Sequence, residues 1–190
     1  MRVKDLQDNH DLGSAFPNAL KNDALIAVAA FPQNPRSWTS FSLRVASETV
    51  SIPRRIYHDP TSIRLAKLTR LQRELVDCLL TRHHSGFVRQ RSLERIIGST
   101  HEWVPPFVVQ LVGEYVIEIM NVVHANLNNL DKSLYGQFLA ENREFLATTE
   151  RRVISYWNCY YRHRKKQEYA GFQILDFLKT LAAQYNSTGV

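Results

Sequence analysis

"LLTRHHSGFVRQRSLERII", residues 79–97, is the stretch that decides how the chain is expected to fold. Two adjacent histidines follow a leucine stripe, and a Ser-Gly step precedes a second apolar run at helical spacing. Serine is a good N-cap for the second helix, and Gly98 stands where a C-terminal glycine belongs. The stretch therefore predicts a tight helix–helix corner. Adjacent helical histidines point about 100° apart, so no metal site is expected here.

Apolar residues continue at spacings of three and four on both sides of this corner. Upstream, the leucine stripe predicts a helix over residues 61–83. Downstream, the same periodicity predicts further helices, which cover residues 88–97, 107–112, 115–123, 134–146, 153–161 and 172–185. Thr148 and Thr149 offer a break or a cap between two of them.

The N-terminal segment has a different pattern. Residues 19–31 predict a short apolar helix that ends before Pro32. Apolar residues then alternate with polar ones on both sides of a short polar turn, at Phe41, Leu43, Val45, Val50 and Ile52. This period of two predicts a β-hairpin. Because a lone hairpin is marginal in water, we expect it to pack on the helices that follow.

The length and composition favour one compact unit. A chain of 190 residues with 44% hydrophobic and 11% aromatic residues can bury a real core. We expect residues 1–60 to form the short helix and hairpin, packed on a helical-hairpin domain over residues 61–186. Residues 187–190 are expected to form a frayed tail.

Nothing in the sequence predicts a membrane or secreted protein. No apolar run approaches 18 residues, and the N-terminus lacks the apolar stretch of a secretory signal. Cys78 and Cys159 each lie in a largely apolar stretch and are expected to be reduced core residues. We therefore expect a cytoplasmic protein.

Charge is distributed unevenly along this basic chain, whose net charge is +6 and whose pI is about 9.5. Residues 54–100 carry ten basic and four acidic side chains, and residues 151–190 carry seven and two. The intervening residues 101–150 carry two and seven. The basic segments could form a surface for nucleic acid or for an acidic partner. The pattern is equally compatible with basic and acidic surfaces packing against each other within one fold.

The candidate basic surface comes from these two segments. Its residues are Arg82, Arg89, Arg91, Arg95, Arg162, Arg164, Lys165 and Lys166. On a helix Arg91 and Arg95 are four apart and align. Lysine and arginine contacts to phosphates would give a non-specific affinity that falls steeply with salt.

Catalytic and cofactor motifs are not found in the sequence. There is no GxSxG, GxGxxG or P-loop, and no HxxxH, HExxH or CxxC. Cys78 lies five positions before His83, and residues five apart on a helix do not face each other well. We therefore name no catalytic residue, metal ligand or cofactor.

Two segments carry a resemblance to a known family. "SGFVRQRSLERI" looks like the second helix of a HEAT-type repeat. "PPFVVQLVGEYVIEIM" resembles the proline-led first helix, acidic corner and second helix of another, with Glu114 at the acidic position. Met120 departs from the pattern, which usually has arginine there. The resemblance covers about residues 65–161.

The HEAT-like resemblance implies a fold and a function. It implies stacked helical hairpins in an α-solenoid-like arrangement, and a binding scaffold with a concave surface. Some HEAT-like folds also resemble DNA alkylation-repair glycosylases, for which Trp103, Trp157 and Glu114 could serve. We therefore expect a mostly α protein with a small N-terminal β-hairpin, acting as a non-catalytic module that binds a protein partner through its helical surface. The alternative is a basic nucleic-acid-binding protein, including a DNA-repair-glycosylase-like one.

Overall fold

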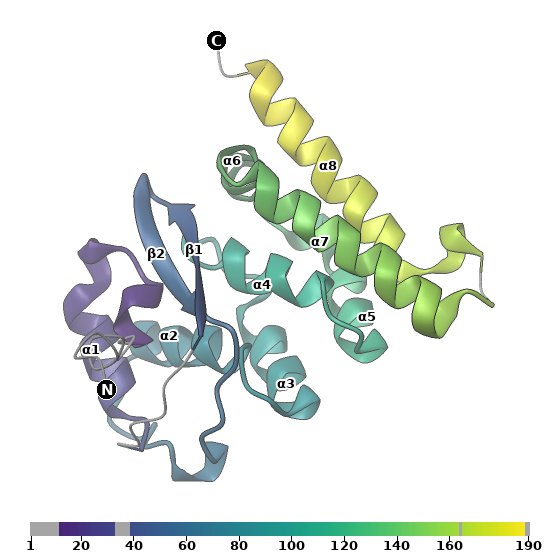
Figure 1. Ribbon diagram of the computed structural model, residues 1–190. Coiled ribbons are helices and arrows are strands. Elements are labelled where there is room, and N and C mark those ends of the chain that lie inside the picture. The colour runs from purple at the N-terminus through teal and green to yellow at the C-terminus, as the bar shows by residue number, and fades with distance from the viewer. Residues whose placement is uncertain (1–11, 33–38, 164, 189–190) are drawn as a thin grey trace, which may run out of the picture.

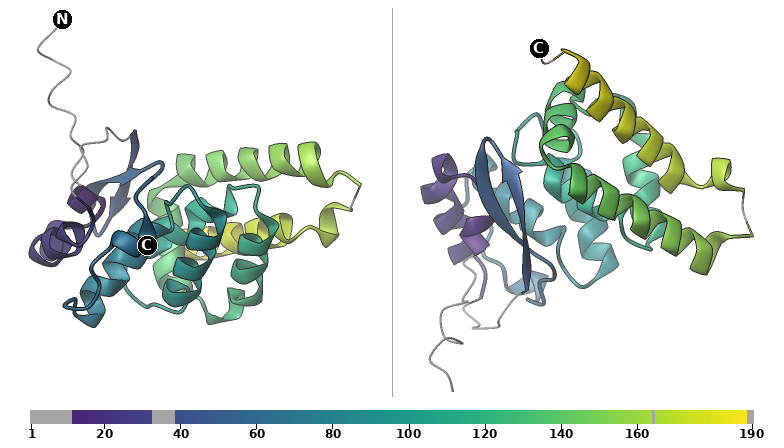
Figure 2. Two further views of the ribbon diagram at one scale, coloured as in Figure 1. Left: turned by 90° about the horizontal axis from the view of Figure 1, so that it is seen from below. Right: turned by 45° about the horizontal axis from the view of Figure 1, so that its top comes forward.

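The computed structural model describes residues 12–32, 39–163 and 165–188. Within these ranges the chain is mostly helical, with eight α-helices and a two-stranded antiparallel sheet. The strands stand between the N-terminal helix α1 (Lys21–Ala29) and the C-terminal helices (Figure 1 and Figure 2), while the first helix after the hairpin packs directly on α1. At this level the predicted mostly α fold with a small N-terminal hairpin is confirmed.

The hairpin consists of β1 (Ser40–Val45) and β2 (Glu48–Pro53). Its turn residues Ala46 and Ser47 have φ angles of 52° and 63°. A two-residue turn of type I′ needs this left-handed conformation at both positions, because its twist then matches that of the strands. The predicted alternation is confirmed by the buried side chains of Leu43, Val45, Val50 and Ile52.

Asn142 pairs with the free edge of β1. Its Oδ1 accepts a hydrogen bond from the backbone N–H of Arg44 at 2.9 Å, and its Nδ2 donates to the Arg44 carbonyl at 2.9 Å. The same Nδ2 donates to the carbonyl of Phe138 at 2.8 Å. One side-chain amide thus takes the place of a neighbouring strand, and it ties the hairpin to the helices that flank it.

Asn142 also marks the break between two helices, which the sequence predicts at Thr148 and Thr149. It separates α6 (Lys132–Glu141) from α7 (Arg143–Tyr156). The break or cap predicted at Thr148 and Thr149 is wrong, since both lie inside α7. The buried Thr149 hydroxyl donates to the Phe145 carbonyl one turn earlier at 2.9 Å, so it stays compatible with the helix.

Helix α2 (Arg70–Leu80) begins at Arg70 rather than near residue 61. The Thr69 side chain accepts from the Gln72 backbone N–H, and the Gln72 side chain accepts from the Thr69 N–H, which makes a capping box. Gln72 Nε2 also donates to Asp23 of α1 at 2.8 Å. The leucine period extends upstream of this point, but the cap fixes where the helix starts.

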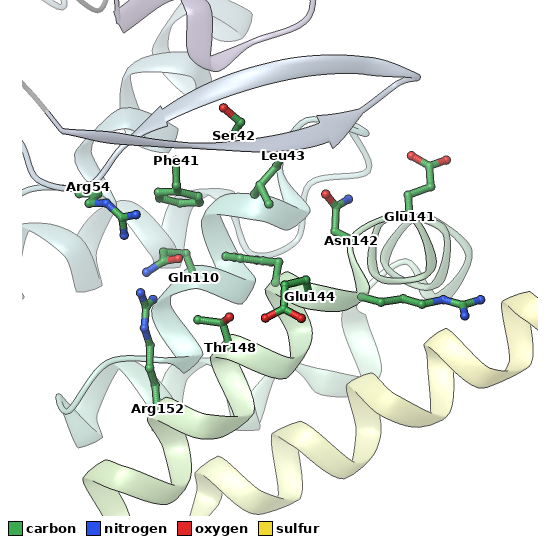
Figure 3. A pocket seen from close by; sticks show the side chains of 12 residues that line it. Phe41, Ser42, Leu43, Arg54, Gln110, Glu141, Asn142, Glu144, Thr148 and Arg152 are labelled. Carbon is green, nitrogen blue, oxygen red and sulfur yellow. The ribbon is translucent and has the colours of Figure 1, made fainter.

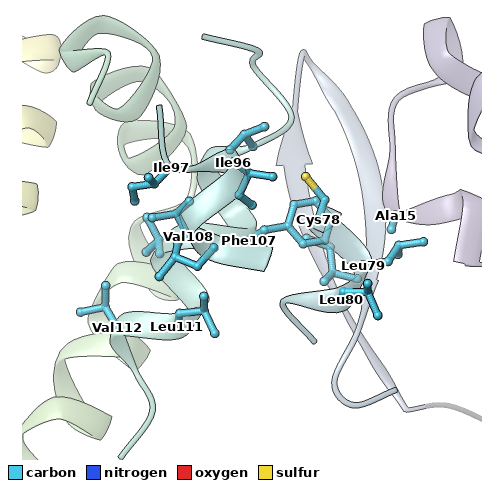
Figure 4. Packing of buried hydrophobic residues seen from close by; sticks show 14 of the residues in the cluster. Ala15, Cys78, Leu79, Leu80, Ile96, Ile97, Phe107, Val108, Leu111 and Val112 are labelled. Atoms are coloured by element: carbon cyan, nitrogen blue, oxygen red, sulfur yellow. The ribbon is translucent and has the colours of Figure 1, made fainter. Parts of the chain in front are cut away.

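Helix α4 (Pro105–Val112) is the centre of the core. All of its residues are buried, including Gln110, as expected for a helix enclosed by other elements. Side chains from α2, α3 (Gly86–Ile96) and α4 gather in one cluster, shown in Figure 4. Leu75 and Leu79 are fully buried, which confirms that the leucine stripe faces inward.

The C-terminal helices close the other side of the molecule. Helix α5 (Ile117–Ala125) packs on α3 and on α8 (Ala170–Thr188), and α8 packs along α6. A Cβ on Gly136 would lie 3.0 Å from the carbonyl oxygen of Leu181, so a glycine allows the close approach of α6 and α8. Helix α8 extends through Thr188, which includes the start of the expected tail.

Candidate functional site

The corner between α2 and α3 is occupied by a neutral histidine. His83 Nδ1 accepts from the backbone N–H of Ser85 at 3.0 Å, so Nε2 carries the proton and donates to the His58 carbonyl at 2.7 Å. Burial lowers the pKa of His83; the hydrogen bond to the His58 carbonyl opposes this effect, and the charges of His84 and Arg89 reinforce it. Both ring nitrogens are engaged, which confirms the structural role predicted for this corner.

In residues 12–32, 39–163 and 165–188, no group of three or more His, Cys, Asp or Glu side chains could hold a metal ion. Ser99, His101 and Glu74 lie together, but the Ser99 hydroxyl and the Glu74 carboxylate both approach Nδ1 of His101, at 3.2 and 2.7 Å. A nucleophile–base–acid relay needs both ring nitrogens, so this trio does not form one.

The strongest electrostatic feature is a cluster of three arginines on Glu114. Oε1 of Glu114 lies 3.1 Å from Arg55 Nη1 and 3.1 Å from Arg82 Nη1, and Oε2 lies 2.8 Å from Arg89 Nε. The side chains of Arg82 and Arg89 are only 2% exposed and that of Glu114 is 5% exposed. Three guanidiniums on one carboxylate leave the cluster with a net formal charge of +2.

The buried arginines also satisfy backbone carbonyls that no regular ladder reaches. Arg89 Nη1 donates to the carbonyls of His83 and His84 at 2.9 and 2.8 Å, where α2 has ended. Arg82 donates to the carbonyls of Pro53 and Arg54 at 3.3 and 2.9 Å. The cluster thus fixes the chain that leaves β2 against the α2–α3 corner.

Burial opposes the charge on these groups without removing it. Burial lowers the pKa of Arg82 to about 10, against the opposite effect of Glu114. Burial likewise lowers the pKa of Arg89, again opposed by Glu114. A guanidinium with a pKa of about 10 is still protonated at neutral pH, so the cluster keeps its excess positive charge.

A pocket of about 230 Å³ opens beside this cluster, and it is called the arginine pocket below. Its lining residues are Arg54, Arg55, Arg82, Gln110, Gly113, Glu114, Arg152 and Tyr156. Glu114 is the only acidic residue among the described residues that line it. The Glu114 cluster forms the floor of this pocket. With Arg54 and Arg152 added to its three arginines, five guanidiniums and one carboxylate give the pocket and its floor a net formal charge of +4.

A larger cavity of about 370 Å³, the hairpin groove, adjoins the arginine pocket between β1 and α7. Its lining residues are Phe41, Ser42, Leu43, Arg54, Gln110, Glu141, Asn142, Arg143, Glu144, Phe145, Thr148 and Arg152. Figure 3 shows Arg54 and Arg152 directed toward Gln110, which both cavities share. The Phe41 and Phe145 rings stack at 5.8 Å and form an apolar wall. The two cavities therefore make one continuous depression with a basic end.

The structure divides the predicted basic surface. Arg82 and Arg89 are buried, so the prediction that they belong to an exposed basic surface is wrong. Each is held below the surface by its ion pair with Glu114 and by hydrogen bonds to backbone carbonyls. Exposed side chains are found at Arg91, Arg95, Arg162, Lys165 and Lys166. Arg95 pairs with Asp77 at 2.8 Å. Arg164 lies outside the described residues.

Of the arginines that line the depression, sequence reasoning named only Arg82. Arg54 and Arg55 follow the hairpin directly, and Arg152 lies in α7, where no motif singles it out. One signal was present: Glu114 is a single carboxylate between two apolar runs, and such a group needs a buried partner. The sequence did not show which of the many arginines would supply it.

Other predicted residues have structural roles. Trp103 stacks on His101 at 4.2 Å and Trp157 packs edge-on against Phe172 at 5.8 Å, so neither indole lines the arginine pocket with Glu114. Cys78 is buried, as predicted, and burial raises the pKa of its thiol. The prediction that Cys159 is a core residue is wrong. It is exposed, because Trp157–Tyr161 form a π-helical extension of α7 whose middle faces solvent.

No family model, curated protein or solved structure matches this chain significantly. None of the described helices is both long and apolar enough to cross a bilayer. Function is therefore inferred from the residues and their geometry.

Proposed function

We propose that this chain is a non-catalytic interaction module that binds an acidic segment of a protein partner in the arginine pocket and the hairpin groove. The observation that carries the proposal is the cluster on Glu114, where three guanidiniums share one carboxylate. With Arg54 and Arg152 beside it, the depression attracts an anion. Arginine is also enriched in the cores of protein interfaces, since its planar fork binds carboxylates with two hydrogen bonds.

Exposed aromatic residues at the rim support a protein partner. Tyr156 lines the arginine pocket, and its ring lies 5.9 Å from that of Tyr115 and 6.3 Å from that of Tyr160. Tyr115 and Tyr160 are 53% and 59% exposed. Tyrosine and arginine are the residues that most often dominate interface energies, so this rim is suited to a hot spot.

The HEAT-like arrangement is part of the same proposal. Helix α2 packs on α3, α4 packs on α5, and α3 packs on α5. The last contact joins the second helices of two successive hairpins, as stacking of repeats requires, and it supports the arrangement for residues 65–161. The cytoplasmic location expected from the sequence stays a prediction.

The proposal is tested by affinity capture from native lysate, with and without nuclease. The wild type and matched single-substitution variants serve as baits. The wild type and Arg91→Glu, whose exposed arginine lies on α3 outside both cavities, should retain the same acidic proteins after nuclease treatment. Arg152→Glu should lose them, because it places a negative charge in the arginine pocket. Equal capture by Arg152→Glu would contradict the proposal.

Nucleic acid is the second candidate, and one observation favours it. The exposed residues Arg162, Lys165 and Lys166 follow Tyr160 closely, and single strands bind where basic residues accompany aromatic rings. If a single strand binds there, Arg162→Glu with Lys165→Glu should lower the slope of log affinity against log salt by about 0.7 per lost phosphate contact. Affinity that is weak and unchanged by these substitutions would remove this candidate.

A further inference from the structure

We infer that the arginine pocket receives a phosphoryl group, carried by a phosphorylated side chain in the partner's bound segment. This inference rests on the proposed function, because it names the anion that the acidic segment presents. The pocket's described lining contains four arginines and a single carboxylate. That carboxylate already accepts hydrogen bonds from Arg55 and Arg82 and forms an ion pair with Arg89.

The charge favours a dianion over a carboxylate. Around the pocket and its floor the formal charge is +4, and one carboxylate would neutralise only a quarter of it. A phosphoryl ester carries roughly −1.5 to −2 charges at neutral pH and has three strong acceptor oxygens. It therefore neutralises about twice as much of the local charge.

The directions of the donors also fit a group with three oxygens. Arg54 and Arg55 follow the hairpin in the linker, and Arg152 reaches in from α7. Figure 3 shows the guanidiniums of Arg54 and Arg152 directed at Gln110 from different elements. Donors that converge from several sides match the tetrahedral oxygens of a phosphoryl group better than the two coplanar oxygens of a carboxylate.

The scaffold holds these arginines in place before any ligand binds. Arg82 donates to the carbonyls of Pro53 and Arg54, which fixes the backbone that carries Arg54 and Arg55. At Gly113 a Cβ would lie 3.2 Å from Arg152 Cδ, so the glycine leaves room for the Arg152 stem. Gly113 is thus a positioning residue for Arg152. Donors held in this way lose less freedom on binding.

The hairpin groove gives the bound segment its direction. It shares Arg54, Gln110 and Arg152 with the arginine pocket and continues to the stacked rings of Phe41 and Phe145. Arg54 lies over the Phe41 ring, 5.5 Å from its centroid, at the junction of the two cavities. A phosphorylated residue in the pocket would place a neighbouring apolar residue against these rings.

The test uses the full chain and three pools of short degenerate peptides that differ only at the central residue. That residue is phosphoserine, glutamate or serine. The phosphoserine pool should bind about tenfold more tightly than the glutamate pool, a difference of about 1.4 kcal/mol. The serine pool should bind most weakly, because it presents no fixed charge to the arginines.

Two variants and one control tie this preference to the pocket. Arg152→Gln should remove the preference for phosphoserine. Gly113→Ala should reduce it, because the new methyl group displaces the Arg152 side chain. The Gly113 backbone has φ −83° and ψ 25°, which alanine tolerates, so this variant stays informative if Arg152→Gln destabilises the fold. Arg95→Gln, outside both cavities, should bind like the wild type.

The outcomes separate this inference from the proposed function. Equal affinity for the phosphoserine and glutamate pools, lost in Arg152→Gln, would overturn the phosphoryl inference and leave the acidic-segment proposal standing. If no pool binds but capture from lysate still depends on Arg152, the phosphoryl inference is likewise overturned and the acidic-segment proposal still stands. A single-stranded oligonucleotide that displaces the phosphoserine pool and binds more tightly at physiological salt would overturn both.

Discussion

Nε of Arg89 lies 2.8 Å from Oε2 of Glu114, and the side chains of both residues are almost completely removed from solvent. Such a pair is favourable only as long as both partners are present, because each alone would be a buried charge without compensation. In this chain the same carboxylate also compensates the buried Arg82. Glu114 therefore supports the fold in addition to forming the floor of the arginine pocket.

Glu114→Gln is expected to lower the free energy of unfolding by about 3–5 kcal/mol, the usual cost of breaking a buried ion pair from one side. Urea denaturation measures the change. Glu144→Gln is the matched control, since Glu144 pairs with Arg151 where both side chains are largely exposed. The control should change stability by less than about 0.5 kcal/mol. Similar losses for both variants would mean that the Glu114 cluster is solvated.

Leu79→Ala is expected to cost about 2–5 kcal/mol, because it opens a cavity where α2 packs on the central helices. Phe87→Ala is the control on a neighbouring helix, since Phe87 is 78% exposed. It should cost little. If Leu79→Ala cost under about 0.5 kcal/mol, the leucine stripe would be a solvent-exposed or interface surface instead.

The pKa of His83 predicts how stability changes with pH. It is lowered in the folded state from its ordinary value of 6.5, so the unfolded chain binds a proton first as the pH falls. His83 therefore contributes stability that is complete above about pH 6.5 and is lost as the pH falls below that value. Urea denaturation across this range should show a shallower loss for His83→Gln than for the wild type. An equal loss for His83→Gln and the wild type would contradict this role of His83.

Gly171 should not tolerate a larger side chain. A Cβ there would lie 2.6 Å from Tyr169 Cε1, 2.8 Å from Met120 Cε and 2.9 Å from Val153 Cγ1. Gly171→Ala is therefore expected to cost about 1–3 kcal/mol through overpacking, measured by thermal and urea unfolding. Gly98 has no atom within 4 Å of its Cβ position, and Gly98→Ala should be neutral or stabilise by up to about 1 kcal/mol. A neutral Gly171→Ala would show that α8 can shift away from α5.

The hairpin turn can be stabilised. Ala46 and Ser47 hold left-handed backbone angles that cost a non-glycine residue roughly 1–2 kcal/mol. Ala46→Asn with Ser47→Gly supplies the pair that type I′ turns prefer, and it should raise the free energy of unfolding by about 1–2 kcal/mol. Ser47→Val is the opposing control and should lower it. A double variant that lowers stability would mean that the turn is of another type.

The sequence by itself determined the elements whose signals are local. The leucine stripe shows which face of α2 is buried, the alternation from Phe41 to Ile52 shows the hairpin, and the His-His-Ser-Gly step shows the corner. Periodicity reports the faces of helices and strands because neighbouring side chains repeat in a fixed geometry. It reports the ends of helices less well, since a cap depends on single hydrogen bonds. The N-cap of α2 at Thr69 and the break at Asn142 were missed for this reason.

Only the tertiary structure decided which charges are buried and which form a site. Arg82 lies 32 positions from Glu114, and Arg44 lies 98 positions from Asn142, so neither contact leaves a periodic trace in the sequence. The basic and acidic segments were compatible both with an exposed basic surface and with packing against each other, and for Arg82 and Arg89 the second holds. A buried charge is stable only where partners from other elements converge on it, and that convergence is a property of the folded chain.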